Sequence, residues 1–231
     1  ADEINRAPSR VQNSLLEAME ERQITVGGQA YKMPDLFMVM ATQNPVEQAG
    51  TYALPEAQMD RFLMHVTVTY PDEDSEVEII RMVRAEEAAK RQEAGEEGQK
   101  ADKPSGAAKP APTDQKTIFA ARREIDAVAV PENVERYLID LIFATRYPQR
   151  FNYELKSYIA AGASPRGSLS LDRCSRALAW LQGRDHVTVE DVQAMIKPAL
   201  RHRILRGERA LKHNVSTDEI IDDILELVKV P

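Results

Sequence analysis

The strongest constraint on the fold is a stretch from Glu86 to Lys116 that contains no valine, isoleucine, leucine, methionine, phenylalanine, tyrosine or tryptophan. Such a stretch cannot bury enough apolar surface to offset the entropy lost on ordering it. We interpret its later, proline-rich part as a mobile linker and expect Glu86 to Gln92 to continue a helix that begins near Asp72. The chain is therefore predicted to have an α/β part over residues 1–85, a linker over 86–116 and a helical part over 117–231.

The part before the linker alternates between helix and strand patterns. Apolar residues recur at helical spacing between Ser9 and Glu21, and Gly27-Gly28 is typical of a two-residue hairpin turn. The continuous apolar run from Leu36 to Ala41 is typical of a strand buried in a parallel sheet. Alternating apolar residues between Arg61 and Tyr70 predict a further strand.

After the linker almost every pattern is helical. One helix is predicted to end before Pro148, and another to begin at Ser164-Pro165. Two more are predicted from capping boxes, in which Thr188 precedes Asp191 and Ser216 precedes Glu219 by three residues. We expect an all-helical second domain of about four helices.

Composition excludes several classes of protein. No apolar run approaches the roughly 20 residues that a membrane-spanning helix needs. Because the chain has a single cysteine, Cys174, it cannot form an internal disulfide, which fits a reducing compartment. We predict that Cys174 is buried as a small apolar side chain. The formal net charge of −7 argues against general nucleic-acid binding. We therefore expect a cytoplasmic protein that contacts neither membranes nor nucleic acid.

Two sets of polar residues in the α/β part suggest chemistry. Asp2 and Glu3 are adjacent acids, which more often lie on a solvated face but can also divide the work of holding Mg²⁺ and orienting a water. Asn44 follows the apolar run from Leu36, where ligands of parallel sheets bind. It either forms a turn before Pro45 or hydrogen-bonds a water or a phosphate oxygen.

Two arginines are further candidates. Arg61 follows Asp60 directly, which indicates either a local salt bridge or an arginine presented to a phosphate, including one on a neighbouring subunit. Arg166 lies in the first turn of a predicted helix, where a cation opposes the helix dipole unless a negative partner compensates. Arg166 is therefore either a phosphate ligand or a plain surface arginine.

Other charged residues have less specific patterns. The histidines His65, His186, His202 and His213 show no metal-binding spacing. Five basic residues form a stripe: Arg201, Arg203, Arg206, Arg209 and Lys212. The stripe either binds acidic partners or nucleic acid, or it is a solvated helix end or a contact with a neighbouring subunit of a ring.

Together these motifs resemble the second half of an AAA+ ATPase, specifically of the MoxR family. The matching segments, in the family's order, are residues 1–7, 15–26, 41–45, 54–62, 162–166 and 200–203. Magnesium chelatase and MCM helicase subunits share parts of the pattern. The resemblance implies an α/β fold, in which a partial parallel-sheet P-loop ATPase core is followed by an all-helical lid. It also implies a chaperone-like function in a ring that hydrolyses ATP.

The resemblance also implies a role for each candidate residue. Asp2 would coordinate Mg²⁺, Glu3 would polarise the attacking water, and Asn44 would be sensor 1. Arg61 would be the arginine finger and Arg166 would be sensor 2 in the lid. The implied cofactors are ATP and Mg²⁺. The implied partners are further copies in a ring, a hexamer by analogy, with a von Willebrand factor A-domain protein and a client protein.

One departure from the family pattern is the absence of any Gly-x-x-x-x-Gly-Lys-Ser/Thr motif from this sequence. We expect that an N-terminal part is missing and that these residues alone neither bind ATP tightly nor hydrolyse it. Two alternatives remain open at this point: a non-hydrolysing adaptor that reuses the fold, and an MCM-like nucleic-acid motor.

Overall fold

A computed structural model describes residues 1–44, 52, 54–95 and 112–231, and the chain divides into two compact units. The first unit comprises residues 1–66 and 114–231, and the second comprises residues 67–113. The predicted domain limits at residues 85 and 117 stay predictions.

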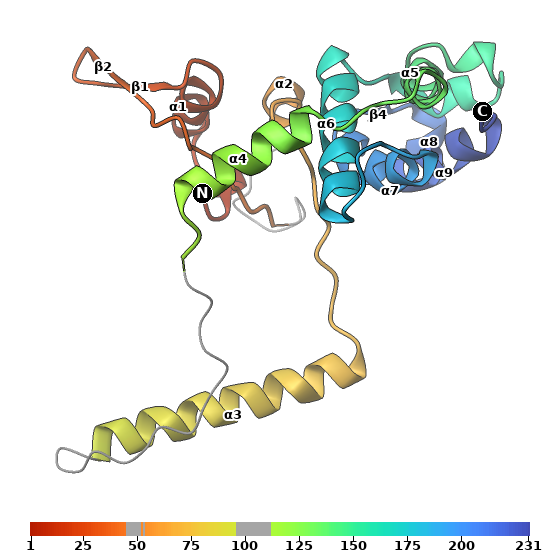
Figure 1. Ribbon diagram of the computed structural model, residues 1–231. Helices are drawn as coiled ribbons and strands as arrows, with labels where there is room; N and C mark the ends of the chain where they lie inside the picture. Colours follow the sequence, from red (N-terminus) through yellow and green to blue (C-terminus); the bar gives the residue numbers. More distant parts are fainter. Residues whose placement is uncertain (45–51, 53, 96–111) are drawn as a thin grey trace. The chain divides into compact units, whose positions relative to one another are not determined.

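The described part of the second unit contains the long helix α3 (Glu73–Gly95), which Figure 1 shows as a continuous rod. The helix begins after Asp72, whose carboxylate accepts a hydrogen bond from the backbone N–H of Ser75 at 2.8 Å. The prediction that Glu86 to Gln92 continue a helix is confirmed. The later part of the predicted linker, residues 96–111, lies outside the described residues.

The first unit begins with a short 3-10 helix and then α1 (Ser9–Glu20), β1 (Gln23–Val26), β2 (Gln29–Lys32) and α2 (Glu56–Met59). The predicted hairpin is confirmed, since β1 and β2 pair antiparallel. Gly27 and Gly28 have φ angles of 60° and 82°, which residues other than glycine adopt only with strain.

Two predicted strands, over Leu36–Ala41 and Arg61–Tyr70, are not strands in this structure. A strand needs a neighbouring backbone to complete its hydrogen bonds. Met40 O accepts a hydrogen bond from Ala1 N at 2.7 Å, and Thr42 N donates to Ala1 O at 3.0 Å, which is the spacing of a parallel pair. Among the residues that the structure describes, no strand is assigned beside either segment, and several of their apolar side chains are exposed, including Met38, Met40, Val66 and Val68.

The helical part begins within the predicted linker, because Asp114 caps a helix that the sequence did not predict. Its carboxylate accepts a hydrogen bond from Lys116 N at 3.3 Å. The helices and strands in order are α4 (Gln115–Asp126), α5 (Glu132–Arg146), β3 (Ile159–Ala161), α6 (Pro165–Leu181), α7 (Val189–Leu200), β4 (Leu205–Arg206), α8 (Glu208–Lys212) and α9 (Thr217–Leu227). The start of α6 at Ser164 and both capping boxes are confirmed.

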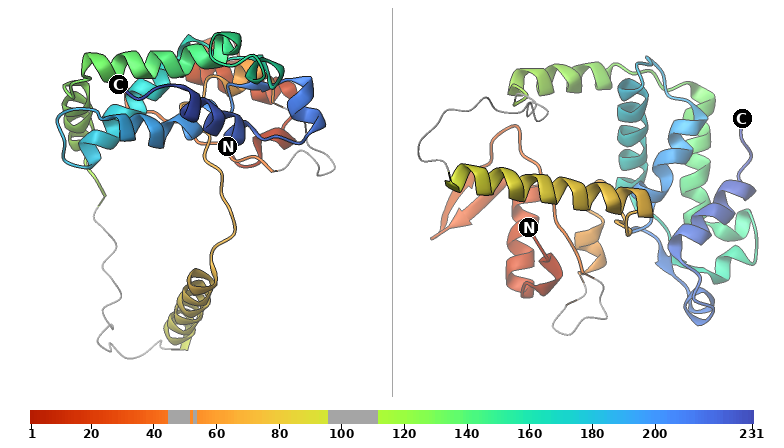
Figure 2. Two further views of the ribbon diagram at one scale, coloured as in Figure 1. Left: turned by 90° about the vertical axis from the view of Figure 1, so that its right-hand side faces the viewer. Right: turned by 90° about the horizontal axis from the view of Figure 1, so that it is seen from below.

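Helices α5, α6, α7 and α9 pack around one apolar core (Figure 2). Fully buried members include Leu141 from α5, Leu171 from α6, Ile196 from α7 and Ile220 from α9. Cys174 is buried as predicted, and this burial raises the pKa of its thiol to about 11. Within the described residues, no helix combines the length and apolarity needed to cross a membrane.

One glycine fixes how the chain enters α6. A Cβ atom on Gly162 would lie 2.3 Å from the backbone oxygen of Thr145, so no other residue fits there without moving the backbone. The next residue, Ala163, donates its N–H to the Thr145 hydroxyl at 3.0 Å. The close approach therefore places Ser164 and Arg166 at the start of α6.

Candidate functional site

Two segments that lie about 40 positions apart in the sequence meet in one group of residues, here called the Glu3 cluster (Asp2, Glu3, Thr42 and Asn44). Glu3 Oε1 accepts a hydrogen bond from Asn44 Nδ2 at 2.7 Å. The Thr42 hydroxyl donates to Asp2 Oδ1 and accepts from the Glu3 N–H, the latter at 2.8 Å. Three of the predicted site residues, Asp2, Glu3 and Asn44, thus lie together.

Asn5 holds Asn44 in place and was not predicted from the sequence as a site residue. Its side chain is fully buried, and its Nδ2 donates to Asn44 O at 2.8 Å while its Oδ1 accepts from Asn44 N at 3.3 Å. An amide offers both a donor and an acceptor, so one side chain satisfies both backbone groups. The signal was an amide two residues after Glu3, which the motif contains but spacing alone does not explain.

The backbone at Glu3 adopts an unusual conformation. Its φ and ψ angles are both 48°, in the left-handed region that costs a non-glycine residue roughly 1–2 kcal/mol. The hydrogen bonds of Glu3 and the ion pair of its Oε2 with Arg6 Nε at 2.9 Å hold this conformation. The Glu3 side chain stays 39% exposed, so a water can reach it.

The Glu3 cluster fits Mg²⁺ in the way that nucleotide sites usually hold it. Mg²⁺ prefers oxygen ligands and commonly takes only one or two carboxylates, with water and substrate phosphates completing its shell. The exposed carboxylate of Asp2, beside the Thr42 hydroxyl, offers that chemistry. Among the described residues, no group of three or more histidine, cysteine, aspartate or glutamate side chains forms a metal site made by protein alone.

The two candidate arginines meet in a second group, here called the arginine cluster (Glu20, Asp60, Arg61, Arg166 and Arg203). Arg166 Nη2 lies 2.7 Å from Glu20 Oε1, and Arg166 Nη1 lies 3.4 Å from Asp60 Oδ2. Arg61 forms an ion pair with the other oxygen of Glu20. These contacts supply the negative partners that a cation in the first turn of α6 needs. The position of Arg166 on its helix is therefore no evidence by itself for a phosphate.

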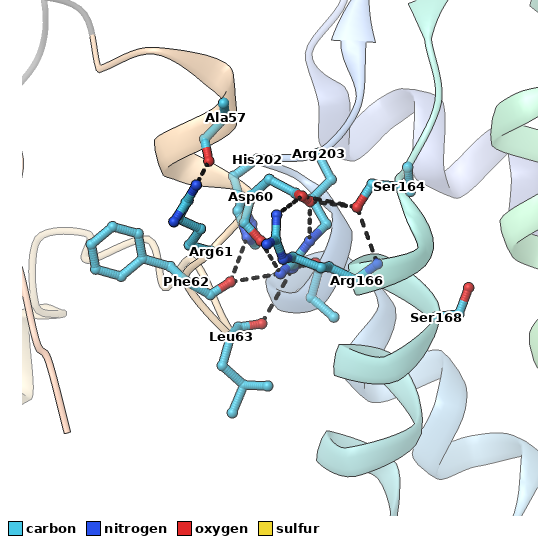
Figure 3. Close-up of polar contacts among 12 residues, drawn as sticks. Ala57, Asp60, Arg61, Phe62, Leu63, Ser164, Arg166, Ser168, His202 and Arg203 are labelled. Carbon is cyan, nitrogen blue, oxygen red and sulfur yellow. Dashed lines mark hydrogen bonds and ion pairs between the residues drawn. The ribbon is translucent and has the colours of Figure 1, made fainter. Parts of the chain in front are cut away.

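Arg203, in the turn that follows α7, is the buried centre of the arginine cluster (Figure 3). Its side chain is 1% exposed, and its Nε lies 3.0 Å from Asp60 Oδ1. Its Nη atoms donate to the backbone oxygens of Asp60, Phe62 and Leu63 at 2.9, 2.7 and 3.3 Å. Every guanidinium nitrogen is therefore used to fix the segment that carries Arg61.

Neighbouring groups complete the environment of Asp60. Burial by itself would raise the pKa of Asp60, but the Ser164 hydroxyl, which donates to both carboxylate oxygens at 2.8 and 2.9 Å, and the guanidinium groups of Arg203 and Arg166 hold it below its usual value. Burial lowers the pKa of His202 to about 4. His202 is thus neutral near pH 7, and its Nε2 lies 3.1 Å from Phe62 O, where an N–H donates.

The predicted basic stripe is not a solvated surface at Arg203, and that interpretation was wrong for this residue. Other members also bond within the protein. Arg201 pairs with Asp218 at 2.8 Å, Arg209 pairs with Glu154 at 2.6 Å, and Arg206 donates to a backbone oxygen. The sequence shows the run of positive charge but not the carboxylates, which are distant in sequence.

Comparison with known proteins identifies both parts of the chain. Residues 1–64 match the ATPase family associated with various cellular activities (AAA), and residues 153–224 match the AAA lid domain. The whole chain is 39% identical to the chaperone MoxR1 of Mycobacterium tuberculosis and 33% identical to the protein MoxR of Paracoccus denitrificans. The chain belongs to the MoxR family of AAA+ ATPases. The predicted fold class, an α/β AAA+ core followed by a helical lid, is confirmed.

The lengths of these relatives limit what the comparison covers. The chain spans 56% of MoxR1 and 66% of the Paracoccus protein. A crystal structure of an ATPase candidate from Cytophaga hutchinsonii is 38% identical, with a TM-score of 0.82, over all of this chain and 65% of that one. Within this MoxR-family chain, the Glu3 cluster lies in the AAA match, whereas the arginine cluster joins the AAA match to the lid match.

The ion pair between Asp60 and Arg203 predicts how stability depends on pH. The folded state lowers the pKa of Asp60. The stability that the ionised carboxylate contributes is therefore complete above its unfolded pKa of about 3.9, and it is lost as the pH falls through the folded pKa. We expect Asp60→Asn to lower the free energy of unfolding by about 2 kcal/mol at pH 7. Denaturant unfolding from pH 7 to pH 2.5 should show this difference shrinking only below about pH 4. A difference that is unchanged at the lowest pH would contradict the assignment.

Proposed function

We propose that these residues form the part of an ATPase that positions the attacking water and senses the γ-phosphate, in a ring that remodels a client protein. The observation that carries the proposal is the hydrogen bond of 2.7 Å between the Glu3 carboxylate and the Asn44 amide, with Asp2 beside it. A carboxylate acceptor and an amide donor held this close together can both contact one water that attacks a phosphate. Membership of the MoxR family supports the same proposal, and one relative is named a chaperone.

The chemistry divides among the residues of the Glu3 cluster. Bound Mg·ATP supplies the phosphoryl group, and the metal neutralises its charge. Glu3 accepts a hydrogen bond from the water and orients it, while the amide of Asn44 fixes the water's position against the γ-phosphate. Asn5 keeps Asn44 in place through its two backbone contacts. Asp2 would hold the metal through its exposed carboxylate.

The arginine cluster supplies positive charge for the phosphate oxygens. Phosphoryl transfer depends mainly on positioning and charge stabilisation, which guanidinium groups provide. The side chains of Arg61 and Arg166 are 21% and 47% exposed, so both are accessible to a ligand. We assign Arg61 to a neighbouring subunit's nucleotide and Arg166 to sensing from the lid. A hexameric ring and a von Willebrand factor A-domain partner belong to the same proposal.

Replacing Glu3 by glutamine tests the water-positioning role. In the intact ATPase, which by this proposal also carries a phosphate-binding loop, Glu3→Gln should lower the turnover number at least 100-fold because an amide cannot activate water as a carboxylate does. Mg·ATP affinity should stay within about threefold, because Asp2 still holds the metal. Steady-state turnover and equilibrium nucleotide binding measure the two quantities.

Glu132→Gln is the matched control, since it removes the same charge from an exposed side chain in the first turn of α5. Its turnover should match that of the unmodified protein. Turnover of Glu3→Gln within about twofold of this control would remove Glu3 from the mechanism. Hydrolysis would then have to use another group to position the water.

Mixing two inactive variants tests whether Arg61 acts across a subunit boundary. Rings that combine Arg61→Ala with Glu3→Gln subunits should recover activity, because some interfaces then join an intact water site to an intact arginine. The measurement is ATP turnover against mixing ratio, with subunit exchange demonstrated independently. Activity that never exceeds the sum of the separate variants would show that Arg61 does not act in trans.

A further inference from the structure

The two carboxylate oxygens of Glu20 separately contact the two proposed phosphate-binding arginines. Oε1 lies 2.7 Å from Arg166 Nη2, and Oε2 pairs with Arg61. Arg61 follows α2 and Arg166 lies in the first turn of α6, so the carboxylate joins residues from separate elements. Glu20 lies within the matching segment 15–26, but nothing in the sequence pattern predicts a role for it.

Helix dipoles make both partners of this ion pair unfavourable where they lie. Glu20 is the last residue of α1, where the helix end carries partial negative charge and the last turn has no basic residue. Arg166 lies in the first turn of α6, where the partial charge is positive. Each charge therefore needs an opposite partner at close range, and each supplies it to the other.

Of the two carboxylates in the arginine cluster, Glu20 is the more readily displaced. The side chain of Asp60 is 18% exposed and is held by the Ser164 hydroxyl and the buried Arg203. That of Glu20 is 42% exposed, and a partly exposed ion pair contributes little to stability. An incoming anion can thus replace Glu20 without disturbing the buried pair.

We propose that the Glu20 carboxylate occupies, between Arg61 and Arg166, the position that a phosphate group takes on binding. Glu20 is a positioning residue that keeps both guanidinium groups oriented toward one point and competes with polyphosphates for them. The inference rests on the proposed function, because that function assigns both arginines to phosphate. Loss of the Glu20 charge should therefore strengthen binding of a polyphosphate anion, in the absence of any hydrolysis.

The test uses the 231-residue chain and inorganic triphosphate, with calorimetric titration at low and fixed ionic strength. Glu20→Gln should bind triphosphate about tenfold more tightly than the unmodified chain, since two ion pairs no longer compete with the ligand. The matched control is Glu21→Gln, which removes the same charge from the exposed neighbouring residue. Circular dichroism and the unfolding midpoint verify that each variant is folded.

The outcomes separate this inference from the proposed function. A gain confined to Glu20→Gln, and abolished when Arg166→Ala is added, supports it. Equal gains in Glu20→Gln and Glu21→Gln would show a general effect of net charge and overturn it. No binding by Glu20→Gln at millimolar triphosphate would overturn it too. Either negative result leaves the proposed hydrolysis intact, because that depends on Glu3 in the intact ATPase.

Discussion

The buried ion pair between Arg203 and Asp60 is the interaction on which the arrangement of the arginine cluster depends. A guanidinium that is 1% exposed must satisfy its donors within the protein, and Arg203 does so with one carboxylate and three backbone carbonyls of the segment from Asp60 to Leu63. That segment contains Arg61. Removing one partner of such a pair leaves the other charge buried and unpaired, so the two side chains act as a unit.

This pair connects the two parts that the family comparison recognises. Asp60 belongs to the AAA match and Arg203 to the lid match. Ser164 and Arg166, at the start of α6, contact the same Asp60 carboxylate from the lid side. A change in the lid would therefore act on Asp60 and Arg61 through bonded side chains. The Glu3 cluster depends instead on local contacts, chiefly those of Asn5 with Asn44.

Features that depend on neighbouring residues were predictable from the sequence. The capping boxes, the glycine turn and the start of α6 all follow from side chains within a few residues of the backbone they satisfy. The two predicted strands were wrong because a strand depends on partner strands, which an apolar run cannot supply by itself. Helix α4 was missed because its cap, Asp114, lies in a segment judged only by its lack of apolar residues.

The candidate site shows the same division. The motifs placed Asp2, Glu3, Asn44, Arg61 and Arg166 on the list of candidates, and the structure groups them in two clusters. The supporting residues were missed because their partners are distant in sequence. Asp60 and Arg203 are 143 positions apart, and Glu20 and Arg166 are 146 apart. No pattern of spacing in one sequence joins such pairs.

The most direct test of the account is a double-mutant cycle of unfolding free energies for Asp60→Ala and Arg203→Met. Methionine keeps much of the apolar stem of Arg203 and removes only its charge and donors. The account predicts a coupling energy of at least about 2 kcal/mol at pH 7, because each single change leaves a charge without its partner. A coupling energy below about 0.5 kcal/mol would contradict it, since the two side chains would then contribute independently.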